Sequence, residues 1–427
     1  MREIFSIDDT VENRISFYLL ACLLVVLPYD FFYSQVILIC FGFHCIFHLR
    51  KQQLKNIMTK PVLVQVSFYL LAVAGLLYSQ DKDEAFSIIT RQWAILIMPL
   101  LFSISNFNLQ KYKLRLLCIF GFGCTASILY LYVDALHTIH YFQLPYSSLF
   151  SLIFMNHNFS MPLKLHATYL SIYVALSLVI FLYLLCTEKP LRQKWVYILC
   201  TGLLFAGLIQ LSSRSVFIAF LMIMNLGFPF FLFKGKKRVL FFLTASLISA
   251  ATLFMIGNVD SFKTRYISEL KTDLTDHVTI IDNTEPRLAR WEAIFELVKR
   301  SPIIGYGTGA ERKELKEKFF EKRLYFSYLN EFNAHNQYLS ILIRLGLIGL
   351  ALFLYILYFG FATALRNRDI LFLGFLVIIT VVGVSENFLD MDRGVFFYSF
   401  FLALFLANEW QEVLKPVYSG SKTGNPA

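Results

Sequence analysis

Long apolar runs separated by short polar stretches follow one another along most of the chain. A helix needs about 17–25 predominantly apolar residues to cross the hydrocarbon core of a bilayer. We predict twelve such spans, at residues 15–28, 34–49, 61–79, 88–106, 115–134, 166–186, 195–212, 216–233, 239–257, 337–360, 370–386 and 395–411. One long re-entrant unit is an alternative for the first two. The pattern therefore predicts an all-α polytopic membrane protein with about twelve transmembrane helices.

One polar stretch is far longer than the others and divides the chain into three parts. Residues 1–257 hold the first nine predicted spans with short loops. Residues 258–336 form a large loop outside the membrane, and residues 337–427 hold the last three spans and a tail.

Two short helices are expected inside the large loop. The first begins with Thr284 as its cap and Pro286 in its first turn, and residues 288–298 carry apolar side chains at helical spacing. The second covers about residues 310–324, where Glu alternates with Lys and Arg. Such a charge run is typical of a solvated helix face.

The composition agrees with a membrane location. Of the 427 residues, 57% are hydrophobic and 16% are charged, whereas an ordinary soluble domain carries about 25% charged residues. The mean hydropathy is +0.60. These values exclude a cytosolic enzyme, a secreted disulfide scaffold and a nucleic-acid-binding module, in spite of a formal net charge of +10.

The excess of basic over acidic residues indicates how the chain is oriented in the membrane. Alternate short loops are strongly basic, with Arg50, Lys51, Lys55, Lys60, Lys111, Lys113, Arg115, Lys189, Arg192, Lys194, Lys234, Lys236, Lys237, Arg238, Arg366 and Arg368. The other short loops hold only Lys82, Arg91, Lys164, Arg214 and Arg393. Because basic loops remain in the cytoplasm, the first set and both termini are predicted to be cytoplasmic, and residues 258–336 external.

Neither the cysteines nor the glycines indicate a cofactor. All seven cysteines fall inside predicted spans, where we expect small buried hydrophobic residues rather than a zinc or redox site. The run Gly305-Tyr306-Gly307-Thr308-Gly309 follows a predicted helix and has no Lys-Ser/Thr pair at the required spacing. A phosphate-binding loop needs a strand before the glycines, so a tight turn is favoured and no cofactor is predicted.

Arg214 lies between two predicted spans with almost no loop, in Ser212-Ser213-Arg214-Ser215. A charge near the membrane interior costs about 2.5–3.5 kcal/mol on insertion scales. Two interpretations stay open: the side chain reaches to the interface as an anchor, or it forms an anion site on the external face.

Arg287 and His335 carry similar alternatives. Arg287 begins the first loop helix, where its positive charge is unfavourable unless an anion binds there; the alternative is a solvated surface arginine. His335 stands in Asn333-Ala334-His335-Asn336-Gln337, directly before the tenth span. It is either an interfacial residue or a general base with a pKa near neutrality.

At these residues the chain resembles the O-antigen ligase family, within the superfamily of O-antigen ligases, O-antigen polymerases and protein O-oligosaccharyltransferases. The matching segments are Ser212–Ser215, Arg287–Trp291, Ser301–Gly307, Ala334–Leu339 continuing into Leu345–Leu350, His166–Leu170 and Glu386–Gly394. Their order and placement around one large external loop make the combination specific.

The resemblance implies transfer of a glycan from an undecaprenyl-diphosphate carrier to an acceptor hydroxyl on the periplasmic face of the bacterial inner membrane. The acceptor in ligases is the lipid A–core. By the family pattern, Arg214 and Arg287 would contact the diphosphate and His335 would serve the acceptor. Arg290, one turn from Arg287, is a further candidate for diphosphate binding.

Further support around His335 is expected from Asn336, Gln337 and Glu386. The chemistry fits these residue types, because arginine forks bind phosphate and stay charged, while a base activates the hydroxyl. The implied reaction needs no metal and, as a single displacement, inverts the anomeric configuration.

Three alternatives remain at this stage. An O-antigen or exopolysaccharide polymerase shares the topology and the large external loop. A polysaccharide or lipid transporter would suit twelve spans, although transporters usually show internal repeats and polar residues near the midplane. Asp390-Met391-Asp392 has the Asp-x-Asp spacing of metal-dependent glycosyltransferases, but its position at a span boundary beside Arg393 favours an ordinary loop.

Overall fold

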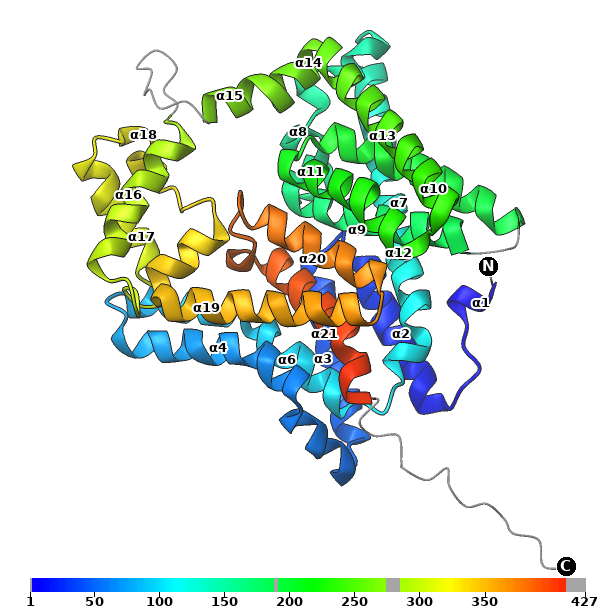
Figure 1. Cartoon of the computed structure of the whole chain (residues 1–427), viewed down its shortest axis with the longest axis horizontal. Coiled ribbons are helices and arrows are strands. Elements are labelled where there is room, and N and C mark those ends of the chain that lie inside the picture. The colour runs from blue at the N-terminus through cyan, green and yellow to red at the C-terminus, as the bar shows by residue number, and fades with distance from the viewer. Residues whose placement is uncertain (1, 188–190, 274–284, 412–427) are drawn as a thin grey trace, which may run out of the picture.

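The computed structural model describes residues 2–187, 191–273 and 285–411, and every regular element in these ranges is helical (Figure 1). The first part of the chain contains α1 (Arg2–Phe5), α2 (Val11–Val26), α3 (Phe31–Phe47), η1 (Lys51–Met58), α4 (Lys60–Tyr78), α5 (Lys82–Arg91), α6 (Trp93–Ile104), α7 (Leu109–Tyr141), η2 (Tyr146–Phe150), η3 (Leu152–Phe154), α8 (His157–Ser160), η4 (Met161–Leu163), α9 (Ala167–Thr187) and α10 (Leu191–Leu211).

The second part contains α11 (Arg214–Met222), η5 (Ile223–Gly227), α12 (Phe228–Leu232), α13 (Gly235–Asn258), α14 (Asp260–Lys263), η6 (Thr264–Ser268), α15 (Glu269–Asp273), α16 (Arg287–Arg300), α17 (Glu311–Glu321), α18 (Tyr325–Leu329), α19 (Gln337–Arg366), α20 (Ile370–Val382), η7 (Phe388–Asp390) and α21 (Asp392–Gln411). The prediction of an all-α polytopic membrane protein is confirmed for the described residues.

Helix length and hydropathy support several membrane spans. Among the described residues, eight helical stretches are long and apolar enough to cross a membrane: Lys60–Tyr78, Lys82–Ile104, Leu109–Tyr141, Ala167–Thr187, Lys194–Leu211, Arg214–Leu232, Gly235–Asn258 and Gln337–Arg366. The shorter apolar helices α3 and α20, together with α2 and α21, coincide with the other four predicted spans. The exact count of twelve stays a prediction.

Some spans differ in detail from the expectation. The span predicted at 88–106 consists of α5 and α6, which meet at Gln92, and the π-helical segment η5 interrupts the span predicted at 216–233. Helix α7 continues to Tyr141, beyond residue 134, where the span predicted at 115–134 was expected to end. The first two runs form two separate helices, α2 and α3, which pack against each other.

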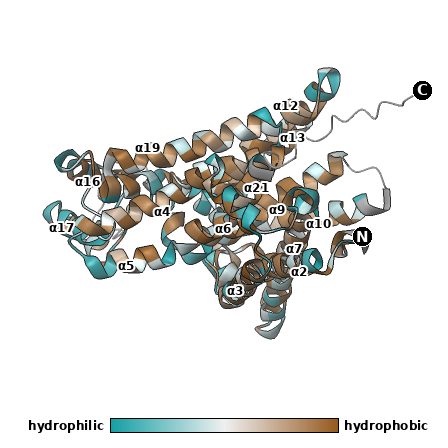
Figure 2. Ribbon diagram, turned by 90° about the horizontal axis from the view of Figure 1, so that it is seen from below, coloured by the Kyte–Doolittle hydropathy of each residue, from teal (hydrophilic) through white to brown (hydrophobic). Residues whose placement is uncertain are grey.

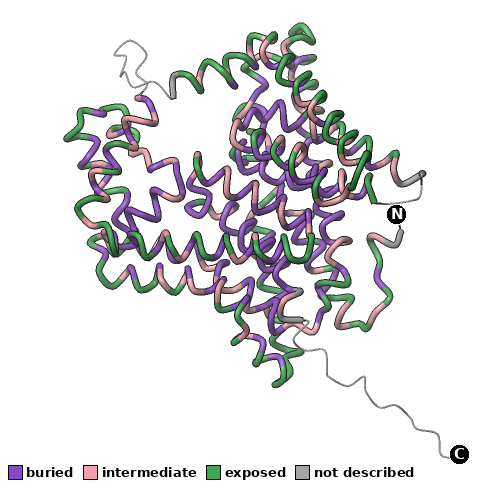
Figure 3. Tube along the Cα trace, viewed as in Figure 1, coloured by how far each residue is buried: buried purple, intermediate pink, exposed green. Residues whose placement is uncertain are grey.

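Helices α9 and α21 run through the centre of the bundle (Figure 3). Every residue of α9 from 167 to 181 is buried, and so is every residue of α21 from 394 to 407. A helix that is apolar on all sides belongs in such a position. In contrast, α13 lies at the periphery, and its exposed apolar side chains suit contact with lipid.

The expectation that the cysteines are buried is wrong for three of them. Cys22, Cys40 and Cys186 are exposed, the other four are buried, and all seven are free thiols. An apolar side chain on a lipid-facing helix surface does not need burial inside the protein, because the bilayer itself is apolar.

The helices predicted within the large loop gather beside the start of α19. Figures 1 and 2 show α16 and α17 at this end of the bundle, where hydrophilic residues are concentrated. Helix α16 begins at Arg287 with Pro286 as its N-cap residue, so Pro286 precedes the first turn. The predicted cap Thr284 lies outside the described residues.

The charged face of α17 is only partly solvated, which corrects the expectation from its sequence. Glu311 and Lys318 are buried. Lys318 pairs with Glu296 of α16 at 2.8 Å and with Glu321 at 2.9 Å. Helix α17 therefore uses part of its charge to bind its neighbours.

The run Gly305–Gly309 forms a turn, as predicted, and this turn packs against α19. Gly346 interrupts α19 with a φ of 62°. There the backbone N–H of Tyr306 donates to the Ile343 carbonyl at 2.8 Å. A Cβ atom at Gly346 would lie 2.3 Å from the Ile303 carbonyl oxygen. The close approach of the two backbones thus requires glycine.

Candidate functional site

A cavity of about 530 Å³ lies where the α10–α11 turn, the start of α16, the segment before α19 and the end of α20 meet. It is lined by Asn156, His157, His166, Thr168, Ser212, Ser213, Arg214, Ser215, Ile218, Arg265, Leu270, Arg287, Leu288, Trp291, His335, Thr380, Val381, Val384, Ser385 and Glu386. Residues from distant parts of the sequence thus share one concave space, in which several basic side chains stand among apolar ones.

Arg214 enters the cavity from a very short turn. Helix α10 ends at Leu211 and α11 begins at Arg214 itself. Ser212 adopts a φ of 51°, and its hydroxyl donates to the Gln210 carbonyl at 3.1 Å. The turn therefore holds a cation at the positive end of a helix, which favours an anion there.

Arg287 enters the same cavity as the first residue of α16. Its Nη1 donates to the Ser385 carbonyl at 3.2 Å, which ties the helix start to the segment after α20. Arg290 lies differently: it is buried, its guanidinium sits 5.1 Å from the ring centre of Phe332, and it is not among the lining residues. Of the two arginines, Arg287 faces the cavity.

His335 lies on the cavity wall, close to a carboxylate. Its backbone has a φ of 44°, and its N–H donates to Asn333 Oδ1 at 3.0 Å. Its Nδ1 is 4.0 Å from Glu386 Oε2. Burial, followed by the charges of Arg290 and Arg287, lowers the pKa of His335 to about 3.

This pKa differs from the near-neutral value expected from the sequence. The sequence does not reveal that two arginines lie beside the imidazole and disfavour its protonation. The lowered pKa favours the neutral form of the imidazole at physiological pH.

Glu386 is the acidic residue of the cavity. Burial raises the pKa of its carboxyl group, while the charge of Arg287, a hydrogen bond from Thr168 and the charge of Arg214 act in the opposite direction. Its carboxylate is the acidic group that lies near the His335 ring in the cavity.

Asn336 and Gln337 are absent from the lining and have structural contacts. The side chain of Asn336 caps α19 by accepting from the backbone N–H of Tyr338 at 3.0 Å. Gln337 Oε1 accepts from the Leu389 N–H at 2.8 Å. Both residues therefore fix the start of α19, directly after His335.

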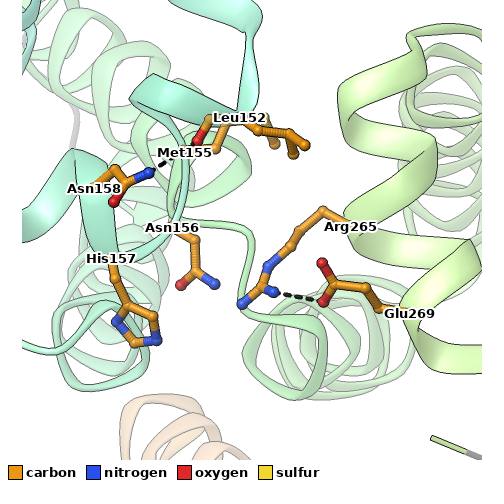
Figure 4. Close-up of a pocket in the computed structure, with 7 residues that line it drawn as sticks. All are labelled: Leu152, Met155, Asn156, His157, Asn158, Arg265 and Glu269. Atoms are coloured by element: carbon orange, nitrogen blue, oxygen red, sulfur yellow. Dashed lines mark hydrogen bonds and ion pairs between the residues drawn. The ribbon is translucent and has the colours of Figure 1, made fainter. Parts of the chain in front are cut away.

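The cavity also contains residues that the sequence analysis did not select. Arg265 of η6 lines it and pairs with Glu269, and the same arginine borders a smaller adjoining cavity of about 240 Å³ (Figure 4). The rings of His157 and His166 lie 4.1 Å apart. Burial lowers the pKa of His166 to about 4, with smaller effects from His157 and Arg265.

A weak signal for these residues was present in the sequence. Arg265 lies in the loop at residues 258–336 that was predicted to be external, and His157 lies between two predicted spans. Nothing in the sequence shows that these two segments fold onto the same cavity. His166 directly precedes α9 and belongs to the segment His166–Leu170, which resembles the family.

Asp390, the first residue of the Asp-x-Asp pair, forms an ion pair with an arginine of α19. Both carboxylate oxygens of Asp390 accept from Arg344, at 2.6 and 2.7 Å. Within the described residues, no group of three or more His, Cys, Asp or Glu side chains is arranged to hold a metal ion. Arg344 is the charged residue that the analysis of the tenth span overlooked; a charge inside an apolar span was its signal.

The chain is similar to a known protein family. Residues 199–354 match the family described as O-antigen ligase. A comparison with curated proteins finds no match. The matched segment contains Arg214, Arg287 and His335, and its limits exclude Glu386.

Proposed function

With the O-antigen ligase family supported over residues 199–354, we propose that this protein is a membrane glycosyltransferase of the ligase type. It transfers a glycan from an undecaprenyl-diphosphate carrier to a hydroxyl of an acceptor, the lipid A–core. The reaction takes place on the periplasmic face of the bacterial inner membrane, where residues 258–336 lie, and both termini are cytoplasmic.

Arg214 and Arg287 bind the diphosphate of the donor in this proposal. When the bond between the anomeric carbon and the diphosphate oxygen breaks, the electron pair stays on that oxygen and negative charge grows there. Two guanidinium groups in a shared cavity supply fixed donors to this charge. They supply the stabilisation that a metal ion provides in other glycosyltransferases.

His335 accepts the proton of the acceptor hydroxyl as the new carbon–oxygen bond forms. A neutral imidazole is the form that can do this. Glu386, 4.0 Å from Nδ1, orients the ring and stabilises the imidazolium that results. Bound diphosphate offsets the charge of Arg287 and so raises the pKa of His335, which strengthens the base when the donor is present.

The observation that carries the proposal is the convergence of Arg214, Arg287 and His335 on one cavity. These residues come from the α10–α11 turn, the start of α16 and the segment before α19. A phosphate-binding pair next to a neutral base matches the needs of glycan transfer from a diphosphate.

Arg214→Lys and Arg287→Lys test the role of the arginines. A lysine keeps the charge but loses the bidentate fork, so we expect kcat/KM for transfer by purified enzyme to fall by about 10–10²-fold, less than the 10²–10³ lost when an oxyanion donor is removed. Arg300→Lys, at the exposed far end of α16, is the matched control. Wild-type transfer in both variants would contradict the proposal.

The products in a deletion strain distinguish a ligase from a polymerase. A ligase leaves lipid A–core without glycan, while full-length polymer accumulates on its carrier. Loss of long chains with single repeats still attached would instead identify a polymerase.

A further inference from the structure

A buried ionic cluster connects the large loop to the bundle next to the cavity. Arg344, in α19, forms a bidentate pair with Asp390 of η7, with its Nη1 2.6 Å from Oδ1. Its Nη2 lies 2.6 Å from Oε2 of Glu311, at the start of α17. The side chains of all three are at most 10% exposed. Asn387 completes the cluster by donating to Asp390 Oδ2 at 3.1 Å.

The same cluster holds the backbone on both sides of His335. Glu311 Oε1 accepts from the N–H of Ala334 at 3.1 Å. Asn387 Oδ1 accepts from the N–H of Asn336 at 2.7 Å. The residue between them has the left-handed φ of 44°, a conformation that costs a non-glycine residue energy and persists only where its surroundings impose it.

The cluster also acts on the carboxylate that faces His335. Glu386 directly precedes Asn387, whose side chain is fixed by its contacts with Asp390 and Asn336. His335 and Glu386, whose side chains lie 4.0 Å apart, are therefore both anchored by the ionic cluster.

We propose that Glu311, Arg344, Asp390 and Asn387 are positioning residues that hold His335 in its strained backbone conformation and set its distance to Glu386. This inference rests on the proposed function of His335. The cluster contacts neither donor nor acceptor in it, because its members are absent from the cavity lining.

An ionic cluster is a costly way to join two elements. Removing an arginine and two carboxylates from water carries a large desolvation penalty, and apolar packing often stabilises a protein equally well. An apolar contact cannot form directional bonds to the backbone N–H groups of Ala334 and Asn336. Hydrogen-bond acceptors held in fixed positions can, and they define the orientation of the backbone on each side of His335.

A double-mutant cycle with His335 tests the proposal. We expect Glu311→Gln and Asn387→Ala each to lower kcat by about 10–10²-fold, the loss typical of a misplaced catalytic group, with donor KM changed less than about twofold. In a His335→Ala background the same changes should alter kcat by less than about twofold, because the group that they position is gone. Asn387→Ala leaves the three charges in place and carries the test if Glu311→Gln fails to fold.

Matched controls separate positioning from stability. Asp369→Asn breaks the Lys113–Asp369 pair of 2.7 Å at the opposite end of α20, and Asn56→Ala removes a buried hydrogen bond to the Ser103 carbonyl. We expect both to lower the midpoint of thermal unfolding about as much as the cluster variants and to leave kcat unchanged.

The outcomes of the cycle are distinct. If Glu311→Gln or Asn387→Ala lowers kcat by the same factor with and without His335, or if both retain wild-type kcat, the positioning proposal is overturned. If His335→Ala itself keeps wild-type kcat, the proposed function of His335 has failed instead.

Discussion

The chemistry of single residues in this protein is set by neighbours that are remote in sequence. His335 is a clear case: its pKa is lowered to about 3, first by burial and then by Arg290 and Arg287. A lowered pKa is what is expected for an imidazole that lies beside cations in a low-dielectric site. In the proposed reaction, a lowered pKa keeps His335 neutral and able to accept a proton, but it also makes His335 a weak base until the donor binds.

The pH dependence of transfer follows from this lowered pKa. The profile of kcat/KM reports the free enzyme, so it should stay level as the pH falls through the reference histidine value of about 6.5 and decline only at lower pH. The profile of kcat reports the donor complex, where the diphosphate raises the pKa of His335, so its acid limb should lie at higher pH. Steady-state kinetics with a purified enzyme measure both.

The variant His335→Gln is the control for this experiment. It should lose about 10²–10⁴ in kcat and show no acid limb that depends on an imidazole. Acid limbs of kcat and kcat/KM that coincide near pH 6.5 in the wild type would contradict the expected substrate dependence.

At the scale of elements, the break in α19 decides how the large loop meets the bundle. The interruption at Gly346 exposes backbone groups of α19, and the turn between α16 and α17 supplies partners for them: the Leu347 N–H donates to the Pro302 carbonyl at 2.8 Å. The break lies two residues after Arg344, so one short stretch of α19 makes both the backbone contact and the ionic contact.

Gly346→Ala should weaken this junction. The new Cβ would meet the Ile303 carbonyl oxygen at 2.3 Å and force an alanine to a φ of 62°. We expect the free energy of unfolding to fall by at least about 1–3 kcal/mol, the usual cost of a strained backbone conformation, measured as a lower midpoint of thermal unfolding in detergent.

Gly202→Ala is the matched control for the junction. Gly202 lies within α10, and a Cβ atom there would have no neighbouring atom within 4 Å apart from the adjoining residues and the backbone of its own helix. Alanine should there be neutral or stabilising by about 0.5–1 kcal/mol, because glycine is a poor helix former. Equal unfolding midpoints for the two variants would show that the junction does not depend on close backbone approach.

At the scale of the whole molecule, the bundle separates two polar ends. Helices α16 and α17 lie at one end (Figure 2), where His335 and the cavity are found. The alternating basic loops predict that this end is periplasmic and that residues 234–238 are cytoplasmic.

Cysteine labelling tests this orientation. Single cysteines at Lys316 and Lys236, in a background without the seven native cysteines, should react differently with an impermeant thiol reagent in intact spheroplasts. We expect labelling at Lys316 and protection at Lys236, because the membrane excludes the reagent from the cytoplasm. Permeabilised spheroplasts, in which both sites should react, are the control; equal labelling in intact ones would refute the topology.

The amino-acid sequence by itself determined the helical class, the positions of the long apolar helices and the one large polar loop. These properties depend on local composition and periodicity, which a short window of sequence contains. The same holds for α16 and α17, whose patterns extend over only a few turns. The residues Arg214, Arg287 and His335 were also identified from the sequence, through short motifs.

Only the tertiary structure decided which of these residues share a cavity. It placed Arg287 in the lining and Arg290 against Phe332, although the two lie one turn apart on the same helix. It brought Arg265 to the cavity from η6, and it joined Glu311, Arg344 and Asp390 from three elements. Contacts of this kind depend on how distant helices pack, and the energy of a buried charge depends on partners that no local window of sequence contains.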